Sequence, residues 1–287
     1  MIMPSVLLRL SRYRLSTPKT YNGIHQGSRQ SLKKGHSLEF SDHKMYQAGD
    51  DLRQIDWNIY ARTNRHYVKT FLDEQSIHIS IYLDSSPSMT VWKEKWEKAK
   101  DLAAAFAFIS LNNGDSITCI PVGTNEFVPI KRKGITMNNQ TVMDICRLPH
   151  PKSAFPFSKG FSTQVQKKSH ISILISDGLE PLSHYKEVLK RVRLKSRKVL
   201  FLQLLSEKED NPHLGKDVKW IDSETREEMN VTLAKKTVEL YGETLQRHCS
   251  SLQSISKNLQ CFYVRSSVEK SLEEIILGEC RKVGWVS

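Results

Sequence analysis

The stretch of residues 77–89 constrains the fold of this chain more than any other feature of the sequence. Apolar residues occupy alternate positions over 77–83, which is the pattern of a half-buried β-strand. The pattern gives way at once to a polar turn that contains Asp84, Ser86 and Ser88, and a helix-like segment follows. A strand, a polar turn and a helix in this order predict one unit of an α/β domain.

A second apolar strand pattern ends in the same manner. Residues 171–176 alternate between apolar and polar side chains, and Asp177 and Gly178 follow directly. Two strand-end carboxylates can converge at the switch point of a doubly wound sheet, where such folds place their ligands. We therefore expect Asp84 and Asp177 to lie at the same edge of one sheet.

Strand and helix patterns alternate over residues 76–287. We expect strands at 77–83, 115–122, 126–130, 171–177, 199–205, 219–222 and 261–265. We expect helices between the Asp84 turn and residue 112, at 141–148, at 184–192, after residue 231, and up to residue 277 behind a capping box of Ser266 and Glu269, with a loop at 149–162. The fold class is therefore α/β, with a doubly wound, mainly parallel sheet of the Rossmann-like kind.

The first 75 residues have a different pattern. Short apolar pieces alternate with Gly-Asp turn signals, which predicts a small β-rich N-terminal module over residues 1–75, before the α/β domain at 76–287. Three carboxylates lie close in sequence to two arginines in this module. We interpret them as a structural charge network and not as catalytic carboxylates; they are Asp50, Asp51 and Asp56, with Arg53 and Arg62.

The charge of the chain favours acidic partners. Its formal net charge is +12 at pH 7, which suits an acidic protein face, anionic lipid or nucleic acid without choosing among them. The five cysteines form no C-x-x-C pair, as expected of reduced thiols in a cytoplasmic protein. No apolar run reaches the roughly 18–20 residues that cross a bilayer.

The N-terminal residues 1–15 combine leucines with arginines. The arginines interrupt the apolar stretch instead of preceding it, so we expect no signal peptide. Two interpretations remain for a short basic helix here, namely packing on its own protein, which we favour, or peripheral contact with a membrane surface.

The Asp84 turn has the oxygen donors that a small divalent cation prefers. A carboxylate and two hydroxyls lie within five residues, and Asp177 adds a second carboxylate. Mg²⁺ takes hard oxygen ligands and keeps several waters, so the pattern predicts a site for Mg²⁺ or Mn²⁺. The alternative is ordinary turn chemistry, because Asp and Ser also cap helices and bond their own backbone.

The spacing of Asp84, Ser86 and Ser88 resembles the first element of the metal-ion-dependent adhesion site (MIDAS) of von Willebrand factor A domains. The resemblance implies a later strand-end Asp, matched by Asp177, and a middle ligand. That middle ligand is usually a Thr after a Gly, and here Ser153 after Lys152 stands in its place, with Thr163 as the second candidate.

Motifs elsewhere resemble the bacterial and archaeal family called domain of unknown function 58. They are the run Gly35–Phe40, the block from Tyr46 through Gly49, Asp50, Asp51, Arg53, Ile55 and Asp56 to Trp57, then Ala61, Arg62, Glu74 and the Asp84 turn. The resemblance runs from about residue 20 to the last helix. It implies a von Willebrand A-like domain that associates with MoxR-type AAA+ ATPases in complex assembly or maturation.

The function that we expect is a non-enzymatic, metal-dependent adaptor that binds a MoxR-type AAA+ ATPase or an acidic protein surface. A metal-dependent hydrolase or phosphoesterase is the first alternative, although position 86 is Ser where an aspartyl phosphotransferase would need a second Asp. Nonspecific nucleic-acid binding is the second, and it is motivated by charge alone, because no nucleic-acid motif is present.

Overall fold

The computed structural model describes most of the chain as two compact units. The residues described are 2–16, 30–31, 40–71, 73–74, 77–90, 92–151, 154–163, 168–210, 217–221, 228–232 and 235–287. One unit comprises Met1–Ser16 and Ile77–Ser287, and the other is Thr17–Ser76. The first sixteen residues thus belong to the α/β unit, whereas the sequence analysis placed them with the small module.

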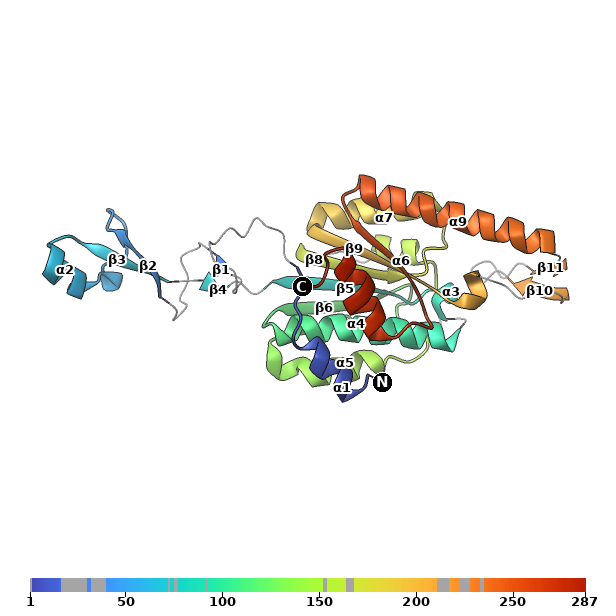
Figure 1. The fold of residues 1–287 in the computed structure, drawn as a ribbon, viewed down its shortest axis with the longest axis horizontal. Helices are drawn as coiled ribbons and strands as arrows, with labels where there is room; N and C mark the ends of the chain where they lie inside the picture. The colour runs from blue at the N-terminus through green and yellow to red at the C-terminus, as the bar shows by residue number, and fades with distance from the viewer. Residues whose placement is uncertain are drawn as a thin grey trace. The chain divides into compact units, whose positions relative to one another are not determined.

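A mainly parallel sheet forms the centre of the α/β unit (Figure 1). Its strands are β5 (His78–Asp84), β6 (Ser116–Val122), β7 (Ile130–Lys133), β8 (Ser169–Ser176), β9 (Ser196–Leu205) and β12 (Phe262–Ser267). They lie in the order β12-β9-β8-β5-β6-β7, and β7 alone among them is antiparallel to its neighbour. This is the doubly wound order in which successive strands are added first on one side of β5 and then on the other. The predicted fold class is confirmed.

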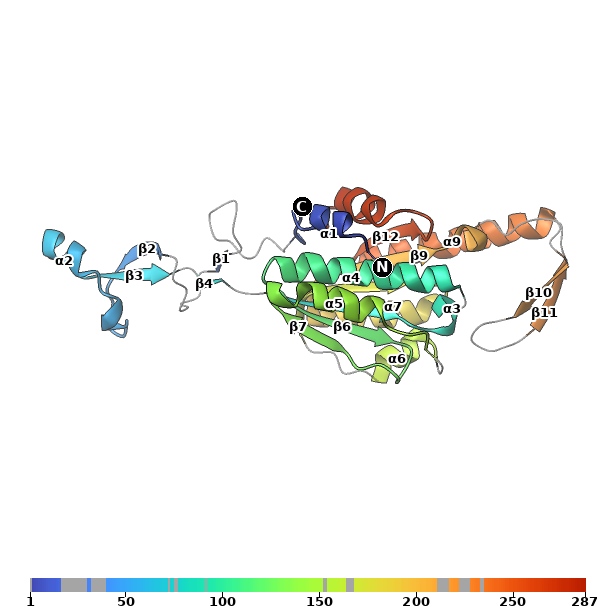
Figure 2. The same cartoon turned by 90° about the horizontal axis from the view of Figure 1, so that it is seen from below.

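Helices cover both faces of the sheet (Figures 1 and 2). They are α1 (Pro4–Leu10), α3 (Pro87–Thr90), α4 (Lys93–Asn112), α5 (Asn138–Cys146), α6 (Phe157–Thr163), α7 (Leu182–Lys195), α8 (Glu207–Asp210) and α9 (Lys235–Asn258), with a 3₁₀ turn η2 (Ile135–Met137) and a π-helix η3 (Glu274–Cys280). On one face, α1, α4, α5 and η3 pack on a core that contains Ile79 and Ile81. On the other, α6, α7 and α9 pack around Tyr82 and Leu174. The alternation of side chains along β5 produces both cores.

Two secondary-structure predictions in the middle of the chain are wrong. The strand expected at 126–130 begins only at Ile130, because Pro129 has no amide hydrogen for the ladder. The loop expected at 149–162 contains the start of α6, where Phe157 and Phe161 lie one helical turn apart and are both buried. Their packing on the second core outweighs the loop-like local composition.

The predicted capping box lies five residues too early. The hydroxyl of Ser271 accepts a bond from the amide of Glu274 at 3.2 Å, and the Glu274 carboxylate accepts one from the amide of Ser271 at 2.7 Å. Ser266 and Glu269 do not form this pair, because β12 continues to Ser267 and delays the start of the helix. An S-x-x-E motif does open this helix, but it is the pair Ser271 and Glu274 and not the predicted pair Ser266 and Glu269.

The N-terminal segment packs on the α/β unit, as the favoured interpretation predicted. Leu10 and Leu15 are buried in the core beneath α4. Leu15 forms a β-bridge with Val286, so residues near both ends of the chain pair with each other. The ammonium of Lys198 donates to the carbonyls of Ser16 at 2.9 Å and Gly284 at 3.2 Å, which fastens this pairing to β9.

A hairpin and the unit Thr17–Ser76 complete the described structure. The hairpin pairs β10 (Asp217–Ile221) with β11 (Glu228–Thr232). In the unit, β2 (Phe40–Met45) pairs with β3 (Tyr67–Phe71), and β1 (Gln30–Ser31) with β4 (Asp73–Glu74), all antiparallel. The unit also contains a 3₁₀ turn η1 (Leu52–Gln54) and a helix α2 (Trp57–Thr63), which the prediction of strands and turns alone had missed.

The carboxylates of this smaller unit have the structural role that the sequence predicted, with Arg53 as one partner, whereas Arg62 donates to the carbonyl of Asn58 instead. Asp56 caps α2 by accepting bonds from the amides at positions 58 and 59, and it also contacts His43 at 2.9 Å. The hydrogen bond from His43 contributes most to lowering the pKa of Asp56 to about 2. Asp50 pairs with Lys44, and Asp51 with Arg53, so each of the three carboxylates has a basic partner.

Candidate functional site

The carboxyl ends of β5 and β8 bring together the two aspartates that the sequence predicted. The strands are parallel neighbours, and Leu83 lies beside Ile175 in their register. The next residues, Asp84 and Ser176, are in direct contact, because the Ser176 hydroxyl donates to Asp84 Oδ2 at 2.6 Å. Asp177 follows at the same edge, so both carboxylates lie at the switch point of the sheet, where β6 and β8 flank β5 on opposite sides.

The turn after Asp84 presents two hydroxyls side by side. The amide of Ser86 donates to Asp84 Oδ1 at 2.8 Å, which is the Asx turn that Asp and Ser commonly form. The hydroxyl oxygens of Ser86 and Ser88 are 3.2 Å apart. Two adjacent oxygens of an octahedral Mg²⁺ shell, each about 2.1 Å from the ion, would be roughly 3 Å apart. The hydroxyl pair therefore has a spacing that suits a hydrogen bond and a small hard cation equally.

Glycines let the chain close tightly around this turn. Gly123 follows β6 with a φ of +106°, and a Cβ added there would lie 2.9 Å from the Ser86 amide nitrogen and 3.0 Å from the Phe155 carbonyl oxygen. A Cβ added at Gly160 in α6 would lie 2.7 Å from the Gly123 nitrogen. The backbone of the Ser86 turn, the loop after β6 and α6 are thus packed without room for a side chain between them.

A buried lysine, which the sequence analysis missed, lies in the site. The ammonium of Lys95, in the first turn of α4, donates to Asp177 Oδ2 at 2.9 Å and to Glu209 Oε1 at 2.7 Å. The side chain of Lys95 is 0% exposed, that of Asp177 is 1% exposed, and that of Glu209 is 16% exposed, so this is a largely buried ion-pair triad. Lys95 engages Asp177, and no basic side chain among the described residues pairs with Asp84.

The electrostatics of the two carboxylates differ accordingly. Complete burial, and secondly the charge of Asp177, raise the pKa of Asp84 well above its ordinary value. Burial by itself lowers the pKa of Lys95, but the charges of Asp177 and Glu209 outweigh it and raise that pKa above 10.5. Asp84 is therefore the group whose negative charge is least compensated in this site.

A second ring of hydrogen bonds holds the aspartates in place. Because the Ser176 hydroxyl donates to Asp84, the hydroxyl of Tyr185 must donate to Ser176 across their 3.0 Å contact. The side-chain amide of Gln203 donates to the Asp177 carbonyl at 2.7 Å. His248 Nε2 donates to the carbonyl of Gly178 at 2.7 Å, and its imidazole is half-buried.

The predicted middle ligand is not placed. Ser153 and Lys152 lie outside the described residues, and Thr163 ends α6 with a side chain that is likewise not described. The described residues contain no cluster of three or more His, Cys, Asp or Glu side chains in metal-binding positions. A metal site here would thus depend on hydroxyls as much as on carboxylates. The hydroxyl pair and Asp84 fit a small hard cation. One oxygen of Asp177, Oδ2, already accepts a hydrogen bond from Lys95.

We expect Asp84→Asn to stabilise the protein by about 1–3 kcal/mol near pH 7 in the presence of EDTA, because a neutral amide removes an uncompensated buried charge. The folded-state pKa of Asp84 is raised above 3.8, the ordinary pKa of an aspartate. The free energy of unfolding of the wild type therefore falls as the pH rises above 3.8. The gain should therefore disappear near pH 4. Urea unfolding of both proteins at the two pH values measures it.

A matched control for this prediction is Asp144→Asn, which removes a carboxylate that is 32% exposed and paired with Arg132. It should cost at most about 1 kcal/mol at either pH. Equal stability of wild type and Asp84→Asn near pH 7 would contradict the uncompensated charge.

None of the helices in the described part of the chain is both long enough and apolar enough to cross a bilayer. The predicted alternative of peripheral membrane contact concerns the N-terminal segment. There, Leu10 is buried and Arg9 pairs with Glu273 at 2.9 Å, so much of that segment already has partners within its own protein.

The family model for the protein of unknown function DUF58 matches residues 42–249, which is most of the chain. The uncharacterized protein Rv1480 of Mycobacterium tuberculosis is 22% identical over 231 residues, covering 77% of this chain and 72% of that protein. The uncharacterized protein Mb1516 of Mycobacterium bovis matches over the same length with the same identity.

Solved structures align with lower similarity. An aerotolerance-related membrane protein from Bacteroides fragilis, with multiple mutations to serines, has a TM-score of 0.43 at 16% identity and covers 73% of this chain and 99% of its own. The hypothetical protein BatB from Bacteroides thetaiotaomicron has a TM-score of 0.39 at 15% identity, with the same coverage. The SpRpn10 VWA domain has a TM-score of 0.38 at 12% identity, covering 71% of this chain and 94% of its own. The strand order of the sheet, and not these alignments, establishes the fold.

Proposed function

The chain belongs to the DUF58 family of proteins of unknown function, and from that premise we propose that it is a non-enzymatic adaptor that docks partner proteins at the carboxyl edge of β5 and β8. The observation that carries the proposal is the convergence of Asp84, Asp177 and the Ser86–Ser88 hydroxyls at the switch point of the sheet. Function in doubly wound folds is concentrated at this position.

The electrostatics of the site support a role for a divalent cation. With all three carboxylates ionised, the triad of Lys95, Asp177 and Glu209 together with Asp84 carries two uncompensated negative charges. One Mg²⁺ or Mn²⁺ would balance them. The residues that would hold it are Ser86, Ser88 and Asp84, with Asp177 kept in place by Lys95. A bound ion would supply a hard ligand position for an acidic side chain of the partner.

Exposed apolar side chains beside the site support docking. Trp92, between α3 and α4, is 39% exposed, and Leu179, two residues after Asp177, is 36% exposed. The ammonium of Lys208 lies 5.0 Å from the centroid of the Trp92 ring. Aromatic side chains such as Trp92 are enriched in protein interfaces. The net charge of +12 would speed the approach of an acidic partner.

The partner that we propose is a MoxR-type AAA+ ATPase, as the family resemblance implied, and the process served is the assembly or maturation of a protein complex. The test uses the full-length chain and the purified ATPase from the same genome, with binding measured by surface plasmon resonance. We expect binding in Mg²⁺ that EDTA weakens at least about tenfold, and that Asp84→Ala weakens equally.

Ser254→Ala provides the control, because Ser254 is an exposed residue near the end of α9, which leads to the start of β12 and so lies toward the amino edge of the sheet. It should bind as wild type does. Binding that survives both EDTA and Asp84→Ala would refute the metal-dependent mechanism. A Trp92→Ala variant that also binds normally would refute docking at this edge.

Metal binding by the free protein is measured separately, by the electron paramagnetic resonance signal of Mn²⁺. Ser86→Ala should weaken Mn²⁺ binding by about tenfold or more, since it removes one of few ligands, and Ser254→Ala should not change it. Identical Mn²⁺ titrations of wild type and Ser86→Ala would exclude Ser86 as a ligand.

A further inference from the structure

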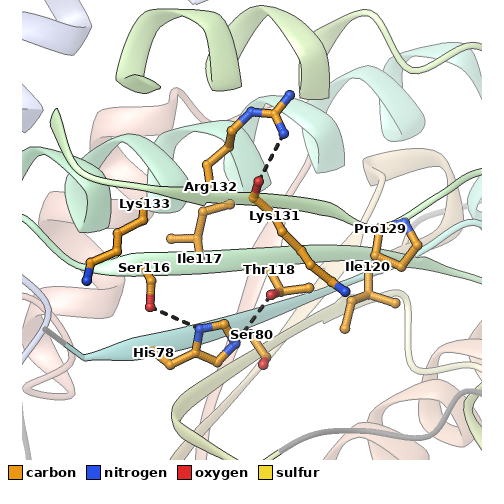
Figure 3. A pocket seen from close by; sticks show the side chains of 10 residues that line it. All are labelled: His78, Ser80, Ser116, Ile117, Thr118, Ile120, Pro129, Lys131, Arg132 and Lys133. Carbon is orange, nitrogen blue, oxygen red and sulfur yellow. Dashed lines mark hydrogen bonds between the residues drawn. The ribbon is translucent and has the colours of Figure 1, made fainter. Parts of the chain in front are cut away.

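A cavity of about 480 Å³ lies on the sheet between β5 and β7, in a part of the unit that the carboxyl-edge site does not include (Figure 3). It begins at His78, the first residue of β5, whereas Asp84 is the last. Six residues of extended strand separate the two, which is about 20 Å. The cavity volume lies within the usual range of small-molecule sites, about 300–1,000 Å³.

The register of the strands places polar side chains in two rows across the cavity. One row runs from His78 through Ser116 to Lys133, which lie directly beside one another on β5, β6 and β7. The other row runs from Ser80 through Thr118 to Lys131. Because side chains two residues apart along a strand share a face, both rows face the same side of the sheet. Each row ends in a lysine on the edge strand.

Hydrogen bonds fix the floor of the cavity. His78 Nδ1 lies 3.1 Å from the hydroxyl of Ser116, and His78 Nε2 lies 3.3 Å from the hydroxyl of Thr118, so the imidazole is held between the two rows (Figure 3). Ser80 and Thr118 are buried in the floor, at 4% and 8% exposure. The polar groups are therefore preorganised before any ligand arrives.

The lysines of the edge strand provide positive charge without acidic partners. Arg132, between them in sequence, points to the opposite side of the sheet and pairs with Asp144 of α5 at 2.9 Å (Figure 3). No carboxylate in the described part of the chain pairs with Lys131 or Lys133. Two strand positions on one face are about 7 Å apart. The two ammonium groups point away from each other along the strand in Figure 3, and rotation about the bonds of these exposed side chains brings both within reach of one small anion between them.

The far end of the cavity is apolar. Ile120 and Pro129 line it beyond Lys131 (Figure 3). Thus a cationic, hydroxyl-lined half adjoins an apolar half within one cavity. The Ser116 hydroxyl already donates to the Ile77 carbonyl at 3.3 Å, so the ammonium groups are the principal donors here. Lysine binds phosphate as a point charge.

We propose that this cavity binds a small organic phosphate monoester. Its phosphate group lies between Lys131 and Lys133 over the Ser116 and Thr118 hydroxyls, and its apolar group packs on Ile120 and Pro129. The site is separate from the proposed adaptor site, because none of the side chains that line it is a proposed metal ligand or docking residue.

The test is isothermal titration calorimetry of the full-length protein with phenyl phosphate as the probe. We expect saturable binding in the millimolar range or tighter. The double variant Lys131→Gln and Lys133→Gln should weaken it at least about tenfold, because two charge-assisted contacts are lost. Both lysines are exposed, so the variant should fold, and its thermal unfolding verifies this.

The control variant Lys186→Gln removes an exposed lysine of α7 and should leave the affinity unchanged. Inorganic phosphate should bind more weakly than phenyl phosphate, because it cannot use the apolar end. The proposal is overturned by the absence of saturable binding, by undiminished binding to the double variant, or by an oligothymidylate that saturates the protein when phenyl phosphate does not.

Discussion

Replacing Lys95 by Met should lower the free energy of unfolding by about 3–5 kcal/mol in the presence of EDTA. The substitution keeps the length of the side chain but leaves Asp177 and Glu209 facing each other without the ammonium that bridges them. Removing one partner of a buried ion pair costs this much because the remaining charge stays desolvated. Chemical denaturation with urea measures the loss.

Two further variants test the cause of that loss. Lys93→Met, two residues earlier on the same helix, removes an exposed lysine and should change stability by less than about 0.5 kcal/mol. The double variant Lys95→Met and Asp177→Asn should recover part of the loss, because it removes one of the two carboxylate charges that Lys95→Met leaves unpaired. A double variant as unstable as the sum of both single variants would show that the ion pair is not the source.

Substituting Gly123 by Ala should lower the free energy of unfolding by about 2–5 kcal/mol. The φ of +106° is unfavourable for any residue with a Cβ, and the new methyl group would meet backbone atoms of Ser86 and Phe155 at about 3 Å. Backbone atoms cannot turn aside as a flexible side chain can. The Ser86 turn must move, so the variant should also lose Mn²⁺ binding if the proposed site exists.

Gly114→Ala separates the two contributions to this effect. Gly114 has a φ of +77°, yet a Cβ added there would meet nothing within 4 Å. The free energy of unfolding of this variant should therefore fall by only about 1–2 kcal/mol, which is the cost of the unfavourable backbone conformation. Its Mn²⁺ binding should be unchanged. Equal losses for Gly123→Ala and Gly114→Ala would mean that close packing around the turn contributes nothing.

The strands could be predicted because burial imposes a simple period on them. The alternating pattern of 77–83 became β5, with one face in each core, and the Asp at its end reached the predicted edge beside Asp177. The fold class followed from the alternation of such strands with helices. The position of the candidate site followed from topology alone, since parallel strands bring their carboxyl ends together.

The composition of the site was less predictable. Lys95 lies in a run of alternating charges from Lys93 to Lys98, a pattern that normally indicates a solvated helix face. Its partners come from 82 and 114 residues further along the chain. Glu209 belongs to a four-residue helix that has no periodicity to detect. Only the packing of distant elements brings these three side chains together, so no local pattern could reveal them.

Opposing effects on stability and binding meet at Asp84. The neutral variant should be more stable, yet the proposed docking site needs the charge. A protein that keeps a destabilising carboxylate at a buried strand end is in the situation common at functional sites, where local stability is reduced for the sake of binding. Measuring stability and Mn²⁺ affinity on the same variants would show whether the two change in opposite directions.

The β-bridge between Leu15 and Val286 has a consequence for biosynthesis. A ribosome that adds about 5–20 residues per second makes the second partner on the order of tens of seconds after the first. Throughout translation, the apolar face that Leu10 and Leu15 bury in the finished protein therefore lacks the contacts that Trp285 and Val286 add to the same core. Nascent chains of this protein should accordingly depend on a holdase chaperone until the last strand and the residues after it emerge from the exit tunnel.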